Sequence, residues 1–159
     1  MTFRELARKN KQISREECVE ILKHEKRGVL SVLGDGDYPY GAPMNHWYNE
    51  EDGCIYFHSG RGGHRNDSVL KNEKASFCVF DKGSETENDW ALTFRSVIVF
   101  GKIEIIDDKS IVSDISRKLC YKFTNDEKYI SEEIERFAAA TILLKLTPLH
   151  ITGKQIEEK

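Results

Sequence analysis

The sequence lacks the features that mark several large functional classes. Its four cysteines, Cys18, Cys54, Cys78 and Cys120, form no C-x-x-C pair, so neither a zinc knuckle nor a redox dithiol is indicated. No stretch approaches the roughly 18 consecutive apolar residues of a membrane-spanning helix. Residues 1–12 are polar and do not resemble a secretory signal, so we expect a cytoplasmic protein with reduced thiols.

The chain also lacks a large excess of positive or negative charge. The chain has 24 Lys and Arg against 27 Asp and Glu, a net charge of -3. Such a balance creates no field that would attract nucleic acid or an anionic membrane. At 159 residues, with 39% hydrophobic and 32% charged residues, we expect one ordinary globular domain over 1–159, with residues 1–13 as an N-terminal arm.

Familiar site motifs are absent as well. We find no Walker G-x-x-x-x-G-K-[ST], no dinucleotide-binding G-x-G-x-x-G and no G-x-S-x-G nucleophile elbow. His46, His58 and His64 form no i, i+4 pair on a helix and have no suitably spaced acidic partner. We therefore expect no metal site.

Hydrophobic periodicity and turn signals are present throughout the chain. Ser14 and Glu17 fit a capping box, so a helix is predicted from Ser14 to near Gly28. Further helices are predicted at residues 64–72, 108–123 and 131–137. Strands are predicted at residues 28–33, 38–48, 54–59, 75–80, 90–106, 140–146 and 150–153, and residues 81–89 are predicted to form an exposed, mobile polar loop.

The order of these elements predicts the fold class. Six or seven antiparallel strands with helices between them, and no β-α-β rhythm, favour an α+β, mainly β, barrel over a doubly wound parallel sheet. Pro39 and Pro43 cannot donate to a strand ladder, which limits their strand to an edge, a bulge or a position facing a ligand. Gly101 is a candidate for a bulge or bend in the long strand.

One stretch, residues 56–65, combines an alternating strand, a glycine-rich turn and the start of a helix. Gly60, Gly62 and Gly63 can adopt positive φ and let backbone N–H groups approach a ligand. The helix N-terminus would add its positive end. A phosphate cradle and an ordinary glycine turn are equally compatible with this spacing.

For other polar residues, too, a structural and a functional role are both possible. His58 ends a strand beside the glycine loop, where a structural histidine is more usual than a catalytic one. Ser59 is better placed to bind an oxygen than to attack one. Arg95 and Ser96 open an apolar run and are suitable donors for a phosphate or a ring carbonyl.

Several of these segments, taken together and in order, resemble the pyridoxamine 5'-phosphate oxidase-like FMN-binding split barrels, and within them the nitroimidazole-resistance (Nim-type) subfamily. The segments are residues 36–44, 55–59, 63–65, 94–101 and 151–154. The resemblance implies an antiparallel, Greek-key-like split β-barrel with peripheral helices. It also implies a homodimer that binds FMN at each subunit interface.

The resemblance further implies roles for individual residues. The backbone around Met44, Asn45 and His46 would line the isoalloxazine, and His58 would lie beside the flavin and the substrate as the catalytic residue. The phosphate end would be held by four residues: Ser59, Gly63, His64 and Arg65. Three more would reach the flavin from the same or the partner chain: Arg95, Ser96 and Val97.

Two departures from the family pattern bear on the substrate. His46 stands where an apolar or hydroxyl residue is expected, which adds a titratable group near the ring. The C-terminal residues 155–159 do not match the substrate-binding residues of true pyridoxamine-phosphate oxidases, so the vitamin B6 oxidase reaction is disfavoured. The sequence predicts a reductase that takes electrons from a nicotinamide donor and passes them to a small planar acceptor such as a nitro-aromatic; a non-catalytic flavin or haem carrier is the alternative.

Overall fold

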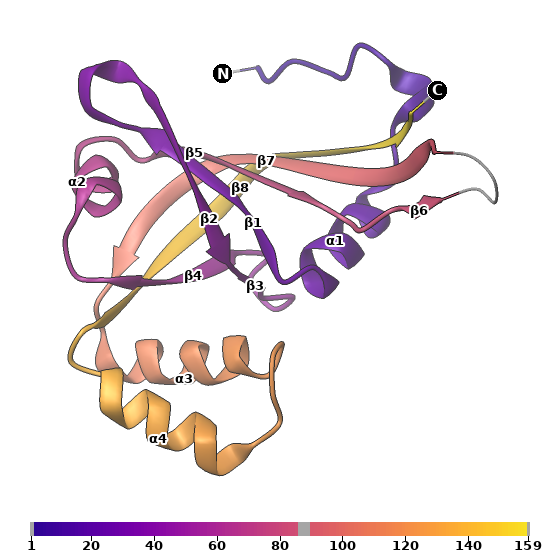
Figure 1. Ribbon diagram of the computed structural model, residues 1–159. Helices are drawn as coiled ribbons and strands as arrows, with labels where there is room; N and C mark the ends of the chain where they lie inside the picture. Colours follow the sequence, from indigo (N-terminus) through magenta and orange to yellow (C-terminus); the bar gives the residue numbers. More distant parts are fainter. Residues whose placement is uncertain (1, 86–89, 159) are drawn as a thin grey trace.

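The computed structural model describes residues 2–85 and 90–158. Its centre is a strongly curled antiparallel sheet with the strand order β2-β1-β5-β7-β8-β4-β3, in which the short β6 pairs beside β7 (Figure 1). The strands are β1 (Arg27–Leu33), β2 (Pro39–Asn45), β3 (Trp47–Tyr48), β4 (Ile55–Gly60), β5 (Lys74–Phe80), β6 (Ser84–Glu85), β7 (Leu92–Ile106) and β8 (Thr141–Glu157). The predicted antiparallel α+β architecture is confirmed.

In the described residues, four α-helices lie around this sheet: α1 (Arg15–His24), α2 (His64–Lys71), α3 (Lys109–Cys120) and α4 (Glu127–Phe137). Figure 1 shows α3 and α4 side by side at one end of the sheet, and α1 and α2 at separate places on its periphery. Single 3-10 turns lie at Lys9–Lys11 and Asp35–Asp37. None of the helices within the described ranges is long and apolar enough to cross a membrane.

The core fills the inside of the curled sheet. Alternate residues of the central strands, including Leu30, Phe77 and Val99, are fully buried, as the two-residue period of a strand requires. Helix α1 adds its apolar face through Ile21 and Leu22. The predicted capping box starts this helix: the Ser14 hydroxyl accepts from the Glu17 amide at 3.1 Å, and the Glu17 carboxylate accepts from the Ser14 amide at 2.8 Å.

Several predicted boundaries were wrong. The predicted strand 38–48 is two strands, β2 and β3, separated at His46, whose side chain is fully buried. The two predicted C-terminal strands are the single strand β8, which pairs with β7 along most of its length. Helix α4 begins before the predicted residue 131, because the Asp126 side chain accepts from the Tyr129 amide and caps an earlier turn. Of the predicted loop 81–89, residues 86–89 lie outside the described residues, and residues 84–85 form β6.

The prolines of β2 and the glycine at position 101 of β7 lie where the sequence predicted. Strand β2, which contains Pro39 and Pro43, is at the edge of the sheet. The β7–β8 register shifts between Phe100 and Gly101. A Cβ on Gly101 would collide with the backbone oxygen of Thr147, so the close approach of the two strands at this bulge requires glycine.

The N-terminal arm contacts the sheet. The ring of Phe3 stacks on the ring of His150 with 4.9 Å between centroids, and Gln12 forms an isolated β-bridge with Lys154. The arm therefore lies beside the C-terminal half of β8.

Candidate functional site

The glycine loop between β4 and α2 forms an open cradle. Gly62 and Gly63 have φ of 80° and 89°, which an L side chain rarely adopts. A Cβ built on Gly60, Gly62 or Gly63 would meet nothing within 4 Å. The backbone conformation thus requires glycine at 62 and 63, and the space above the loop is free for a ligand.

Helix α2 begins at this loop without a side-chain cap, because Gly63 is its N-cap residue. The first backbone N–H groups of a helix have no partner within the helix, so they and the helix dipole favour an anion at this point.

The side chains beside the loop are fixed in one network. The Arg65 guanidinium donates from Nη2 to the Ser59 hydroxyl at 2.9 Å, and that hydroxyl donates to the buried Asn66 side chain at 3.0 Å. The Asn66 amide group donates to the Gly60 carbonyl at 2.6 Å. The Nε of Arg65 is buried and has no protein partner. An oxyanion above the loop would supply the missing acceptor.

The glycine loop is also held to the helical end of the molecule. The Arg61 guanidinium pairs with both carboxylate oxygens of Asp107, one at 2.7 Å, and donates to the Ala139 carbonyl at 2.8 Å. This pairing lowers the pKa of Asp107 below its usual value. Arg61 therefore joins the loop to the starts of α3 and β8.

His64 takes a different direction from that implied by the resemblance. Its Nε2 accepts from the Asp35 amide at 3.0 Å, and its ring lies against Tyr40 with 4.4 Å between centroids. Its side chain holds the β1–β2 turn, so only its backbone N–H faces the cradle through the first turn of α2.

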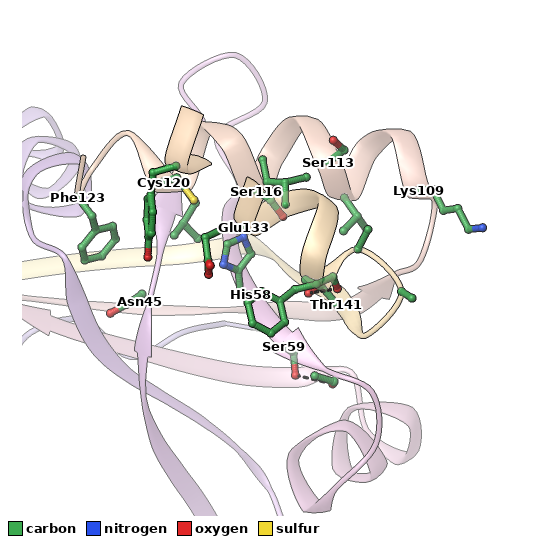
Figure 2. Close-up of a pocket in the computed structure, with 18 of the residues that line it drawn as sticks. Asn45, His58, Ser59, Lys109, Ser113, Ser116, Cys120, Phe123, Glu133 and Thr141 are labelled. Atoms are coloured by element: carbon green, nitrogen blue, oxygen red, sulfur yellow. Dashed lines mark hydrogen bonds between the residues drawn. The ribbon is translucent and has the colours of Figure 1, made fainter. Parts of the chain in front are cut away.

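A cavity of about 650 Å³ opens between β4 and the helices α3 and α4 (Figure 2). Its walls are mainly apolar and include Val112, Leu119, Phe123 and Phe137. His58 lies at this cavity, and Ser59 and Gly60 extend the lining toward the glycine loop. The cradle and the cavity are therefore adjacent parts of one surface, which is the usual form of a small-molecule site.

Two polar atoms at this cavity have no protein partner. Among the buried side-chain atoms of the described residues, these are His58 Nε2 and the Ser116 hydroxyl oxygen. Burial lowers the pKa of His58 below its ordinary value, so the imidazole is uncharged at neutral pH. A neutral imidazole offers a hydrogen bond to a ligand without carrying a charge.

The segment at the end of β2 is only partly at the cavity. Asn45 lines it and accepts from Arg27 Nε at 2.9 Å, whereas the Met44 side chain is in the core. His46 is fully buried: its Nε2 donates to the Leu22 carbonyl at 2.8 Å, and its ring packs on Phe77. Burial, with a smaller contribution from Lys122, lowers the pKa of His46 to about 3. The imidazole of His46 is thus an uncharged part of the core.

Arg95, Ser96 and Val97 lie far from His58 within one chain. His58 on β4 pairs with Leu143 on β8, and Leu143 in turn pairs with Ile106 on β7. Ile106 is at one end of β7, and Ser96 is near the other end. Ten residues of strand at about 3.3 Å each separate Ser96 from Ile106, roughly 33 Å in all. Arg95 Nε donates to the Asp81 carboxylate at 2.8 Å, and Val97 is fully buried.

Sequence reasoning missed three residues here. Ser116, Asn66 and Arg61 each contribute to the cavity or the loop, and none was a candidate. Ser116 had a detectable signal in the sequence, because it lies four residues after Val112 and three before Leu119, on the apolar face of its helix.

In the described residues, no group of three or more His, Cys, Asp or Glu side chains is arranged to hold a metal ion.

Comparison with known proteins identifies the class. A family model described as pyridoxamine 5'-phosphate oxidase matches residues 14–155. The chain belongs to this family, and the resemblance found in its sequence is confirmed. No curated protein matches the chain.

Solved structures share the split-barrel fold. A candidate 5-nitroimidazole antibiotic resistance protein from Bacteroides thetaiotaomicron has 18% identity and a TM-score of 0.76, over 92% of this chain and 87% of the other. An FAD-binding protein from Mesorhizobium loti has 20% identity and a TM-score of 0.67, over 91% and 96%. An FAD and haem binding protein from Mycobacterium smegmatis has 19% identity and a TM-score of 0.71, over 91% and 72%. At these identities the likeness concerns the fold.

Proposed function

We propose that this protein is an FMN-binding flavoprotein of the Nim type. As a homodimer, it would take electrons from a nicotinamide donor and pass them to a small planar acceptor such as a nitro-aromatic. The observation that carries the proposal is the open glycine cradle beside an apolar cavity that contains His58. When bound, the flavin would supply the redox chemistry, and the protein would bind and orient the reactants.

The residues present fit a flavin phosphate. The cradle offers the uncapped first turn of α2, the Ser59 hydroxyl and the unpartnered Nε of Arg65. A phosphate monoester, the end group of FMN, carries enough negative charge and acceptor oxygens to use all three. FAD ends differently, so comparing the two flavins tests this part of the proposal.

A second subunit is proposed because one chain leaves its candidate residues apart. Arg95 and Ser96 are at the far end of β7 from His58, and in a two-fold dimer the partner's copies could approach the cavity. The outer face of the sheet has an apolar row suited to such an interface. The row consists of Pro43, Val29, Cys78 and Ile98, which are neighbours by strand register.

His58 has a defined task in this proposal. Because burial lowers its pKa, it is neutral at pH 7 and does not act as an imidazolium acid there. Its unpartnered Nε2 would hydrogen-bond the flavin or the acceptor and hold it in position.

The experiment is rapid mixing of the FMN-loaded protein with NADH or NADPH. We expect loss of the oxidised-flavin absorbance, and its return when a nitro-aromatic is added under anaerobic conditions. Flavin that binds and is not reduced by either nucleotide would contradict the reductase proposal.

A non-catalytic carrier is the second candidate. The unpartnered Nε2 of His58 at an apolar cavity of about 650 Å³ could also hold the iron of a haem. A Soret band in the purified or haem-titrated protein, lost in His58→Ala, would favour this candidate.

A further inference from the structure

The Ser116 hydroxyl on α3 makes no hydrogen bond within the part of the chain that the structure describes. Ser116 is only 5% exposed, and its oxygen has no hydrogen-bond partner in the protein. A buried serine in a helix commonly donates to the carbonyl four residues earlier, as Ser68 does in α2 by donating to His64 at 2.8 Å. Leaving a buried hydroxyl unpaired costs roughly 1–3 kcal/mol. A ligand in the cavity that Ser116 lines would supply the partner.

His58 reaches the same cavity from the sheet. Figure 2 shows Ser116 on α3 and His58 on β4 as cavity side chains from two different elements. His58 Nε2 is also buried and unpartnered. Two unpaired polar atoms at one apolar cavity are the arrangement that fixes the orientation of a small ligand.

The remaining walls limit the size and polarity of that ligand. Side chains of α3 and α4, among them Val112, Leu119 and Phe137, make most of the lining apolar. A volume of about 650 Å³ is within the range of roughly 300–1,000 Å³ usual for small-molecule pockets. The cavity can therefore hold one or two fused rings.

The charges at the cavity select against an anion. Glu133 contributes a carboxylate to the lining, 3.7 Å from the Arg136 guanidinium, and burial keeps His58 neutral. Lys109 is exposed, and Figure 2 shows its ammonium group pointing away from His58. The described residues that line the cavity thus include an acidic group and no inward cation, so an anionic group among α3, α4 and His58 would find no partner of opposite charge.

We propose that the cavity between α3, α4 and β4 binds an uncharged ring compound with one polar substituent, which pairs with Ser116 Oγ and His58 Nε2. Ser116 is then a specificity residue on the helical wall. The identification of this compound as the electron acceptor rests on the proposed function, whereas the binding site itself rests on the two unpaired atoms.

The test uses calorimetric titration of the purified full chain with 2-naphthamide and with 2-naphthoate, which have nearly the same shape and differ in charge. We expect 2-naphthamide to bind at least tenfold more tightly. Ser116→Ala should weaken 2-naphthamide about five- to tenfold, the worth of one hydrogen bond. Ser113→Ala is the matched control: Ser113 also lines the cavity, but its hydroxyl points away from His58 in Figure 2, so its removal should leave affinity unchanged.

The same titration is then repeated with FMN-loaded protein, and the melting temperature of each variant is measured to verify folding. Binding of 2-naphthamide that survives FMN loading supports the proposal. Three results would overturn it: equal affinity in Ser116→Ala and Ser113→Ala, tighter binding of 2-naphthoate, or loss of 2-naphthamide binding when FMN is bound, which would make the cavity part of the flavin site. If FMN fails to bind while 2-naphthamide still does, the flavin proposal fails alone.

Discussion

His58 and Ser59 are consecutive residues of β4 that serve different parts of the site. Ser59 is tied to Arg65 and Asn66 beside the glycine loop, whereas the His58 ring lies at the cavity under α3 and α4. Successive side chains of a strand point to opposite faces. One short strand can therefore position both the proposed phosphate contacts and the proposed contact with the reacting ring.

Replacing Gly63 by alanine tests the conformation of the cradle. The space around its Cα is open, so the cost comes from the backbone, whose φ of 89° is strained for alanine. We expect a loss of about 1–3 kcal/mol in unfolding free energy and weaker FMN binding. Gly60→Ala is the control, because a Cβ there also meets nothing within 4 Å and φ is not positive. Equal effects of the two substitutions on FMN affinity would rule out the conformational explanation.

His58→Ala tests the role of the imidazole. We expect FMN affinity within about twofold of wild type, because the phosphate contacts remain, and a fall in turnover of at least tenfold, the usual lower range for a lost positioning hydrogen bond. Turnover is measured with NADPH and a nitro-aromatic, and FMN affinity by flavin fluorescence. Unchanged turnover would remove His58 from the mechanism.

The buried His46 predicts acid sensitivity. Its pKa is about 3 in the folded protein against an ordinary value of 6.5, so the unfolded chain binds the proton more readily between these values. The stability from neutral His46 is complete above pH 6.5 and is lost as pH falls toward 3, by about 2 kcal/mol at pH 5.

Urea unfolding at pH 7.5 and pH 5 measures this loss. His46→Gln cannot be protonated and retains a donor for the Leu22 carbonyl, so its loss between the two pH values should be smaller by about the same 2 kcal/mol. An identical pH dependence in the two proteins would show that His46 is not the group responsible.

Ile98→Asp tests the proposed subunit interface. Ile98 is partly buried and lies in the apolar row with Cys78 and Val29, and a carboxylate there would be desolvated in a dimer. Sedimentation velocity should show a dimer for wild type and a monomer for the variant, with FMN affinity reduced together with dimerisation. Lys128→Asp, on the exposed surface of α4, is the charge control and should stay dimeric. A monomeric wild type that binds FMN at full strength would contradict the interface proposal.

The sequence predicted the elements that depend on local chemistry. The capping box at Ser14, the edge position of Pro39 and the bulge near Gly101 follow from the residues themselves, and the structure contains all three. It did not predict that β8 is one long strand, because pairing with β7 continues through Pro148 and no local signal reports that partner.

The same distinction applies to the site. Glycine spacing pointed to the cradle, which depends on neighbours in sequence. The burial of His46, the turn contact of His64 and the cavity position of Ser116 depend on elements distant in the chain. A one-dimensional pattern does not contain those contacts.

The central claim is that the loop between β4 and α2 holds the phosphate of FMN, and titration of the purified protein with FMN, monitored by flavin fluorescence, tests it most directly. The account predicts one FMN bound per chain, at least tenfold weaker binding in Arg65→Ala because a charge-assisted hydrogen bond to phosphate is lost, and unchanged binding in Lys71→Ala, which removes a cation at the other end of α2. Full FMN affinity in Arg65→Ala, or no FMN binding by the wild-type protein, would contradict it.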